Sequence, residues 1–255
     1  MTAQQIWQLA RKCGLDTLGL RAASTWPFPV RVTVNNGREM FVDLRSSIGR
    51  GLFATGQFDM EAINPALAAL EPGATFIDVG ANVGFYSLLA LERVGPTGNV
   101  YSFEIDPRPL RCLRKTVAAY DITNLHVVEA AVSDKNGVLS YSPKAEHGHN
   151  QIDRTGRNWG PTIRSVRLDD WLQEHAVTRV DVIKVDVEGA EKFVLEGAKN
   201  TIAKFKPLLL CEADEKTAST FGYKPAELKA QLDAFGYRTT WLEGVHTPTI
   251  LAIPA

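Results

Sequence analysis

The stretch that decides the fold is "FIDVGANVGFYS", residues 76–87. An apolar run with strand character ends near Asp78, a turn with glycines at positions 80 and 84 follows, and a second apolar run begins at Phe85. A strand that turns tightly into a helix places backbone N–H groups and the positive helix end beside a ligand, and glycine lets that ligand approach closely. The stretch therefore predicts a ligand site at a strand–helix turn.

Three classes of ligand use such a turn, and the neighbouring residues separate them. A P-loop needs Gly-Lys-Ser/Thr, but Gly84 is followed by Phe85-Tyr86, which argues against a nucleoside triphosphate. A dinucleotide site needs a middle glycine where this chain has Asn82, so NAD is disfavoured but stays an alternative. Glu104 ends the next apolar run and suits the two hydroxyls of a ribose. The ligand that fits is S-adenosylmethionine.

Bulk composition favours a globular protein that acts on small molecules. The chain has 255 residues, 45% of them hydrophobic and 22% charged, and its formal charge of -1 argues against a broad nucleic-acid surface. Cys13, Cys112 and Cys211 are far apart and odd in number, which predicts reduced core thiols. Neither a signal peptide nor a run of about 20 apolar residues is evident, so we expect a cytoplasmic protein that does not enter a membrane.

From Gly73 onward, strand and helix patterns alternate as in a doubly wound α/β fold. Asp106 and Pro107 provide an N-cap and first position for one of the helices. A hairpin at the end of the chain would make one strand antiparallel. Strands are expected at 75–79, 100–103, 125–128, 180–185, 208–211, 237–242 and 249–253, and helices at 85–93, 107–120, 190–205 and 225–235.

The first part of the chain reads as an extension, residues 1–72, packed on a cofactor-binding domain of residues 73–255. Apolar residues at 6, 9, 10 and 13 predict an amphipathic helix, and Asn36-Gly37 joins two alternating runs in a β-hairpin. A helix is expected at 63–70. The polar segment 142–161 is interpreted as a long loop that shapes the acceptor site.

Four motifs together resemble the FkbM-type S-adenosylmethionine-dependent methyltransferases. They are "FIDVGANVGFYS" at 76–87, "SFEIDPRP" at 102–109, "VVEAAVSDKNG" at 127–137 and "VIKVDVEGAEKFVLEGA" at 182–198. The resemblance covers roughly residues 73–214 and implies a Rossmann-like class I methyltransferase with a seven-stranded sheet, the last strand antiparallel. It also implies methyl transfer to a hydroxyl of a small molecule, such as a sugar or polyketide.

The resemblance also implies roles for individual residues. The methionine end of the cofactor would lie at the glycine turn, the ribose at Glu104 and the adenine beside Ile105, with Glu129 or Ser133 as polar partners of the base. Asp186, at the end of a strand, would face the methionine amino group or the reaction centre. The residues implied in cofactor binding are Asp78, Gly80, Ala81, Asn82, Gly84, Glu104, Ile105, Ala131, Val132 and Asp186.

Methyl transfer to an alcohol benefits from a base as the proton leaves. His147 and His149 form a close histidine pair in the segment 142–161, and Asp186 and Glu212 follow two neighbouring apolar strands. We take these four residues as candidate catalytic groups. Two carboxylates could also hold a divalent metal, but we favour a metal-free site.

Structural interpretations compete with some of these roles. Lys184 and Asp186 share one strand face and would form an ion pair, while Glu188 and Glu191 would complement a helix dipole. N-methylation of an amine, amide or peptide side chain, an atypical NAD-dependent dehydrogenase and a non-catalytic protein of the same fold stay as alternative functions. The expected partner is a small-molecule acceptor, with a homodimer left open.

Overall fold

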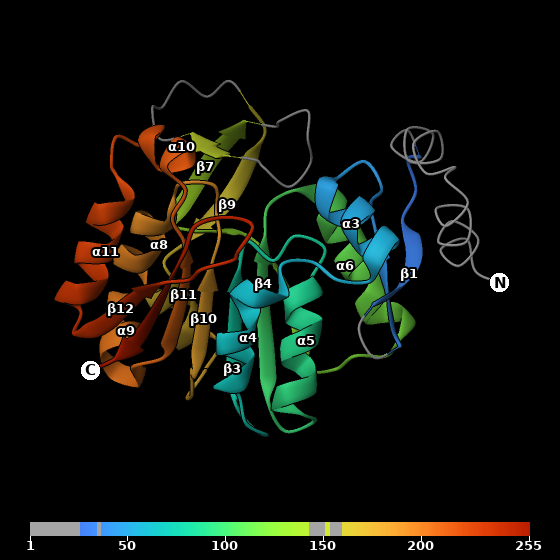
Figure 1. Cartoon of the computed structure of the whole chain (residues 1–255), viewed down its shortest axis with the longest axis horizontal. Helices are drawn as coiled ribbons and strands as arrows, with labels where there is room; N and C mark the ends of the chain where they lie inside the picture. Colours follow the sequence, from blue (N-terminus) through green and yellow to red (C-terminus); the bar gives the residue numbers. More distant parts are fainter. Residues whose placement is uncertain (1–25, 35–36, 143–150, 154–159) are drawn as a thin grey trace.

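The computed structural model describes residues 26–34, 37–142, 151–153 and 160–255 (Figure 1). Its main element is a seven-stranded sheet with the order β12-β13-β11-β10-β3-β4-β5. In that order the strands span Tyr237–Trp241, Thr249–Pro254, Leu208–Glu212, Val182–Val185, Thr75–Val79, Asn99–Glu104 and Leu125–Glu129. Neighbouring strands are parallel except where β13 pairs with β11 and β12. The predicted α/β sheet with an antiparallel last strand is confirmed.

Helices cover both faces of this sheet (Figure 1). Because side chains alternate along a strand, Phe76 enters the core on one face and Ile77 the core on the other. The first core includes α3 (Ser47–Thr55), α4 (Met60–Ala68), α5 (Phe85–Val94) and α6 (Pro107–Ala119). The second includes α7 (Leu168–Glu174), α8 (Glu191–Gly197), α9 (Lys199–Phe205) and α11 (Pro225–Ala234). The apolar strands are buried on both sides, as a parallel sheet requires.

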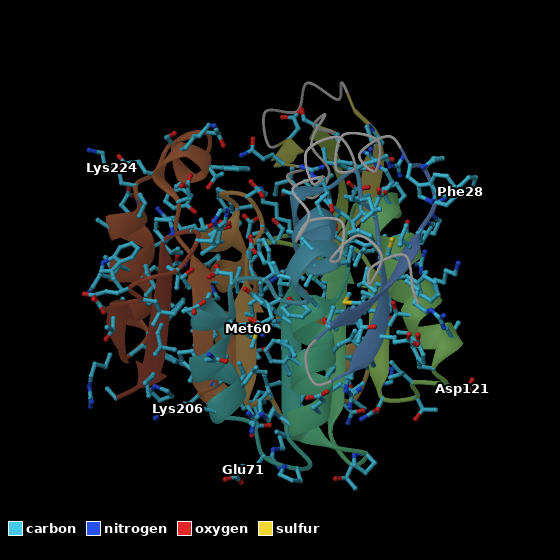
Figure 2. All side chains as sticks on the ribbon, turned by 45° about the vertical axis from the view of Figure 1, so that its right-hand side comes forward. Phe28, Met60, Glu71, Asp121, Lys206 and Lys224 are labelled. Atoms are coloured by element: carbon cyan, nitrogen blue, oxygen red, sulfur yellow. The ribbon has the colours of Figure 1, made fainter. Side chains whose placement is uncertain are left out.

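The two edges of the parallel strands can be followed in Figure 2. Glu71 lies just before β3 and Lys206 just before β11, and both labels stand at the lower end of the molecule. This end is therefore the amino edge of the strands. Ligands of open α/β sheets bind at the opposite, carboxyl edge, where the glycine turn lies.

The first two described strands pack on α6. β1 (Val30–Val34) and β2 (Arg38–Val42) form the predicted antiparallel hairpin, and the Phe41 backbone N–H donates to Thr116 Oγ1 at 2.9 Å. The hairpin shares the first core with the main sheet. The helix expected near residues 6–13 lies outside the described residues, and the domain boundary at 72/73 stays a prediction.

The helix predicted over 190–205 is wrong as a single element. α8 ends at Gly197 and α9 begins at Lys199. The Asp169 carboxylate accepts the backbone N–H groups of Asn200 and Thr201 at 3.1 and 2.8 Å. A side chain from α7 thus caps a new helix start, which the local sequence does not reveal.

The segment 142–161, predicted as a long loop, includes one short strand, β8. This strand belongs to a second sheet, whose order is β6 (Ala131–Val132), β9 (Thr162–Val166), β7 (Gly137–Ser142) and β8 (Gln151–Asp153). Figure 1 shows β7 and β9 above the main sheet. Gln151 Nε2 donates to the Glu188 carbonyl at 2.8 Å and so ties this sheet to the loop after β10.

The expectations about the cysteines and about membrane-spanning helices can be compared with the described residues. Cys112 and Cys211 are free and buried, which confirms them as core thiols. In the part of the chain that is described, none of the helices has the length and apolar character needed to cross a bilayer.

Candidate active site

The backbone N–H groups of the glycine turn donate hydrogen bonds to acceptors of the protein itself. Gly80 and Ala81 both donate to the Phe103 carbonyl, at 3.0 and 2.9 Å, and Asn82 donates to Glu104 Oε2 at 2.7 Å. Val83 donates to the Asn82 side chain, and Gly84 to the Ala81 carbonyl. A pyrophosphate needs such donors for itself. The turn is therefore unsuited to NAD and suited to a ligand that packs against it.

Gly80 is required by its backbone conformation and by its packing. Its φ is +81°, and a Cβ placed there would overlap the carbonyl oxygen of Asp186. At Gly84, φ is +83° and a Cβ would overlap the Leu113 side chain of α6. The turn is thus pressed between the end of β10 and α6.

Glu104 does more than end β4. Its Oε1 accepts the N–H groups of Ile105 and Asp106 at 2.7 and 2.8 Å, while Oε2 accepts that of Asn82. Burial raises the pKa of Glu104 to about 7, although these backbone donors oppose the shift. The carboxylate lines the cavity described below and joins the glycine turn to the loop after β4.

Lys184 connects β10 to the turn through a buried ion-pair triad. Its Nζ lies 3.3 Å from Asp78 Oδ1 and 3.3 Å from Asp186 Oδ2, and it donates to the Gly80 carbonyl at 2.7 Å. Burial lowers the pKa of Lys184, but the two carboxylates outweigh it and raise the pKa above its ordinary value. The ion pair predicted between Lys184 and Asp186 is confirmed.

Asp186 and Glu212 lie on the same edge, as their adjacent strands predict. Burial raises the pKa of Glu212 far above its ordinary range, and the neighbouring Asp186 carboxylate, within hydrogen-bonding reach, adds to the rise. Glu212 Oε2 is buried and finds no hydrogen-bond partner among the described residues. A buried ionised carboxylate would need donors. Burial and the neighbouring Asp186 carboxylate therefore both favour the protonated form of Glu212.

Glu191 supports the loop after β10. We interpreted it as a residue that complements a helix dipole, yet its side chain is buried. Oε1 accepts the N–H groups of Val187 and Gly189 at 3.0 and 3.1 Å, and Oε2 accepts the Tyr223 hydroxyl at 3.0 Å. Glu191 thus fixes the backbone that presents Asp186.

A cavity of about 400 Å³ runs along the carboxyl edge. At one end it meets β4 and the small sheet, and at the other β10, β11 and the loop before β13. Most of the residues predicted to bind the cofactor or act in catalysis line it: Gly80, Ala81, Asn82, Glu104, Ile105, Ala131, Val132, Asp186 and Glu212.

Other predicted residues do not line the cavity. Asp78 is fully buried beneath the turn, where it pairs with Lys184 and accepts the Ser87 hydroxyl at 2.6 Å. We therefore reassign Asp78 from direct cofactor contact to support of the turn. Gly84 has the packing role given above. Of the polar partners suggested for adenine, Glu129 pairs with Arg114 and Ser133 is buried, and neither lines the cavity.

The histidine pair and the carboxylates considered for a metal remain to be placed. His147 and His149 lie outside the described residues. Asp214, two residues after Glu212, caps α10 (Glu215–Ser219) by accepting the Thr217 N–H at 3.0 Å. Within the described ranges, three or more His, Cys, Asp or Glu side chains do not come together in a metal-binding arrangement.

Sequence reasoning missed the wall formed by Phe58, Asp59, Tyr86 and His246, all of which line the cavity. The Tyr86 hydroxyl donates to the Asp59 carbonyl at 3.0 Å, and the His246 N–H donates to Asp59 Oδ1 at 3.1 Å. The rings of Phe58 and His246 meet edge to face, with centroids 5.9 Å apart. Tyr86 could have been found from its place in the glycine motif, but no local signal joins residues 58–59 to 246.

The sheet order, the glycine turn and the acid that closes β4 define a class I S-adenosylmethionine-dependent methyltransferase domain. A family model described as "Methyltransferase FkbM domain" matches residues 78–239. The chain belongs to this family, which confirms the resemblance seen in its four motifs and, with it, the class of enzyme and cofactor. The dehydrogenase alternative is thereby excluded.

Several known proteins are similar to this chain. The 2-O-methyltransferase NoeI of Sinorhizobium fredii is 30% identical over 151 residues, which cover 52% of this chain and 61% of NoeI. The 31-O-demethyl-FK506 methyltransferase FkbM of Streptomyces tacrolimicus is 29% identical, over 51% of this chain and 62% of its own. The crystal structure of a methyltransferase FkbM from Methylobacillus flagellatus has a TM-score of 0.49 and 17% identity, and the match covers 71% of this chain and 44% of that one. The matches thus span about three fifths of these two curated relatives.

Proposed function

We propose that this protein transfers the methyl group of S-adenosylmethionine to a hydroxyl of a small molecule such as a sugar or polyketide. One observation carries the proposal: a single cavity joins Glu104 on one side of β3 to Asp186 and Glu212 on the other. Cofactor and acceptor can therefore meet above the glycine turn. The names of the two relatives, 2-O-methyltransferase NoeI and 31-O-demethyl-FK506 methyltransferase FkbM, each specify a numbered oxygen, which supports the choice of a hydroxyl.

The cofactor would lie with its nucleoside toward β4 and the small sheet. Glu104 would accept the ribose hydroxyls, and the apolar side chains of Ile105, Ala131 and Val132 would pack against adenine. The methionine end would cross the turn, which places the sulfonium near Asp186. Phe58, Tyr86 and His246 would then surround the acceptor.

The reaction needs alignment and a place for one proton. The acceptor oxygen attacks the methyl carbon, the carbon–sulfur bond breaks, and its electron pair stays on sulfur to give S-adenosylhomocysteine. The hydroxyl proton then leaves the acceptor oxygen. Burial and Asp186 favour the protonated form of Glu212, so Asp186 and His246 are the lining groups that we assign to orient the hydroxyl and receive its proton.

The experiment supplies the purified protein with S-adenosylmethionine that carries a deuterated methyl group. Panels of glycosides, hydroxylated polyketides and matched amines serve as acceptors, and mass spectrometry with NMR locates the labelled methyl. The proposal expects a labelled O-methyl product that is lost in Asp186→Asn. A labelled N-methyl product instead would establish the amine alternative and refute hydroxyl transfer.

A further inference from the structure

The lining of the cavity is strongly acidic. Six acids line it, namely Asp59, Glu104, Asp106, Asp186, Glu188 and Glu212, against one lysine and one histidine among the described residues. Glu104 and Asp106 lie at the nucleoside end, where backbone N–H groups hold them. The other acids lie toward the acceptor end that the proposed function defines.

The lysine does not offset these charges. Lys184 is shared by the carboxylates of Asp78 and Asp186, each at 3.3 Å, and its side chain is only 6% exposed. One positive charge between two negative ones leaves the triad with a net charge of about -1. The side chain of Asp186 is 41% exposed, so the excess charge faces the cavity.

Asp59 adds a second carboxyl group to the same wall. Its backbone is held in a left-handed conformation with φ of 39°, and the Tyr86 hydroxyl fixes its carbonyl. The side chain accepts only a backbone N–H, that of His246, among the hydrogen bonds of the described residues that involve it. Asp59 thus lines the cavity, and within the described residues its carboxylate accepts no hydrogen bond from a cationic side chain.

Burial and the Asp186 carboxylate both raise the pKa of Glu212, so Glu212 adds less negative charge to the acceptor end than Asp59 and Asp186 do. The negative charge of the acceptor end therefore comes mainly from these two aspartates. An anionic group brought close to Asp59 and Asp186 would be repelled, and like-charge contacts of this kind exclude wrong partners.

We infer that Asp186 and Asp59 make the acceptor site selective for neutral hydroxylated molecules and exclude acceptors with a carboxylate or phosphate near the methylated position. This inference rests on the proposed placement of the cofactor. It assigns a substrate class that the fold alone does not define.

The test uses two cofactor analogues in which the sulfonium methyl is replaced by a carboxymethyl or by a carbamoylmethyl group. The two groups have nearly the same shape, but the first places a negative charge in the acceptor space and the second does not. Isothermal titration calorimetry gives both affinities in the wild type, in Asp186→Asn and in Asp59→Asn. Glu71→Gln serves as the matched control, since Glu71 is an exposed acid just before β3, at the amino edge of the sheet, that does not line the cavity.

In the wild type and in Glu71→Gln we expect the amide analogue to bind about tenfold more tightly than the acid analogue. Each aspartate variant should reduce this ratio to about threefold or less. Equal binding of the two analogues in the wild type, or a full ratio in both aspartate variants, would overturn the inference. Thermal melting verifies folding, and Asp59→Asn, which leaves the Lys184 triad intact, carries the test if Asp186→Asn does not fold.

The measurement is independent of the acceptor reaction. Failure to methylate any hydroxyl, with the predicted affinity ratio present, would refute the proposed function and leave the charge selectivity standing. Failure of S-adenosylmethionine and both analogues to bind the wild type would refute both.

Discussion

The buried triad of Lys184, Asp78 and Asp186 predicts a large effect for Lys184→Met. Methionine keeps most of the side-chain volume but removes the ammonium. The Asp78 carboxylate, which is fully buried, then loses the ion pair that its Oδ1 makes with Lys184. Breaking a buried ion pair on one side costs about 3–5 kcal/mol in the free energy of unfolding. The Gly80 carbonyl also loses its donor. We therefore expect a loss of about 3–5 kcal/mol in urea unfolding followed by tryptophan fluorescence.

The double variant Lys184→Met/Asp78→Asn separates charge from packing. It removes the uncompensated carboxylate and should recover about 2 kcal/mol relative to the single variant. Lys229→Met is the surface control, because Lys229 pairs with Asp233 where both side chains are more than a third exposed, and its urea midpoint should stay close to that of the wild type. A loss below about 1 kcal/mol for Lys184→Met, or no recovery in the double variant, would refute this account of the triad.

Three other predictions concern the site. Gly80→Ala should destabilise the protein by about 2–4 kcal/mol more than Gly222→Ala in the same urea assay, since both have positive φ but only Gly80 meets a backbone oxygen; equal losses would contradict the packing argument. With the pKa of Glu104 near 7, S-adenosylmethionine affinity should rise about fivefold from about pH 6 to about pH 8, because the ionised carboxylate is the stronger ribose acceptor. Calorimetry should show that this slope disappears in Glu104→Gln. Exhaustive chelation with EDTA should leave cofactor affinity and methyl transfer unchanged, whereas restoration of lost activity by magnesium or manganese would establish a metal site.

Much of the fold could be predicted because its signals are local. Apolar runs buried on both faces mark the parallel strands, Asp106 caps α6 as expected, and Asn36-Gly37 marks the first hairpin. The antiparallel last strand follows from the short turn between residues 242 and 249. These features depend on neighbours in the sequence, where periodicity and capping rules apply.

The missed features depend on contacts between distant segments. Asp169 starts α9 from another helix, and Glu191 holds a loop together with Tyr223. Asp59 meets His246 across 187 positions of sequence. Strand β8 has three residues and takes its stability from β7 and from the Glu188 loop. Such pairs carry no periodic signal, so a single sequence does not reveal them.

The central claim is that S-adenosylmethionine lies across the glycine turn with its ribose at Glu104 and its sulfur toward Asp186. A crystal structure with S-adenosylhomocysteine tests this placement directly. We expect the ribose hydroxyls within hydrogen-bonding distance of the Glu104 carboxylate, adenine beside Ile105 and Ala131, and the sulfur on the β10 side of the turn. A ligand bound in the reverse direction, with its nucleoside against β11 and β13, or bound outside this cavity would contradict the account.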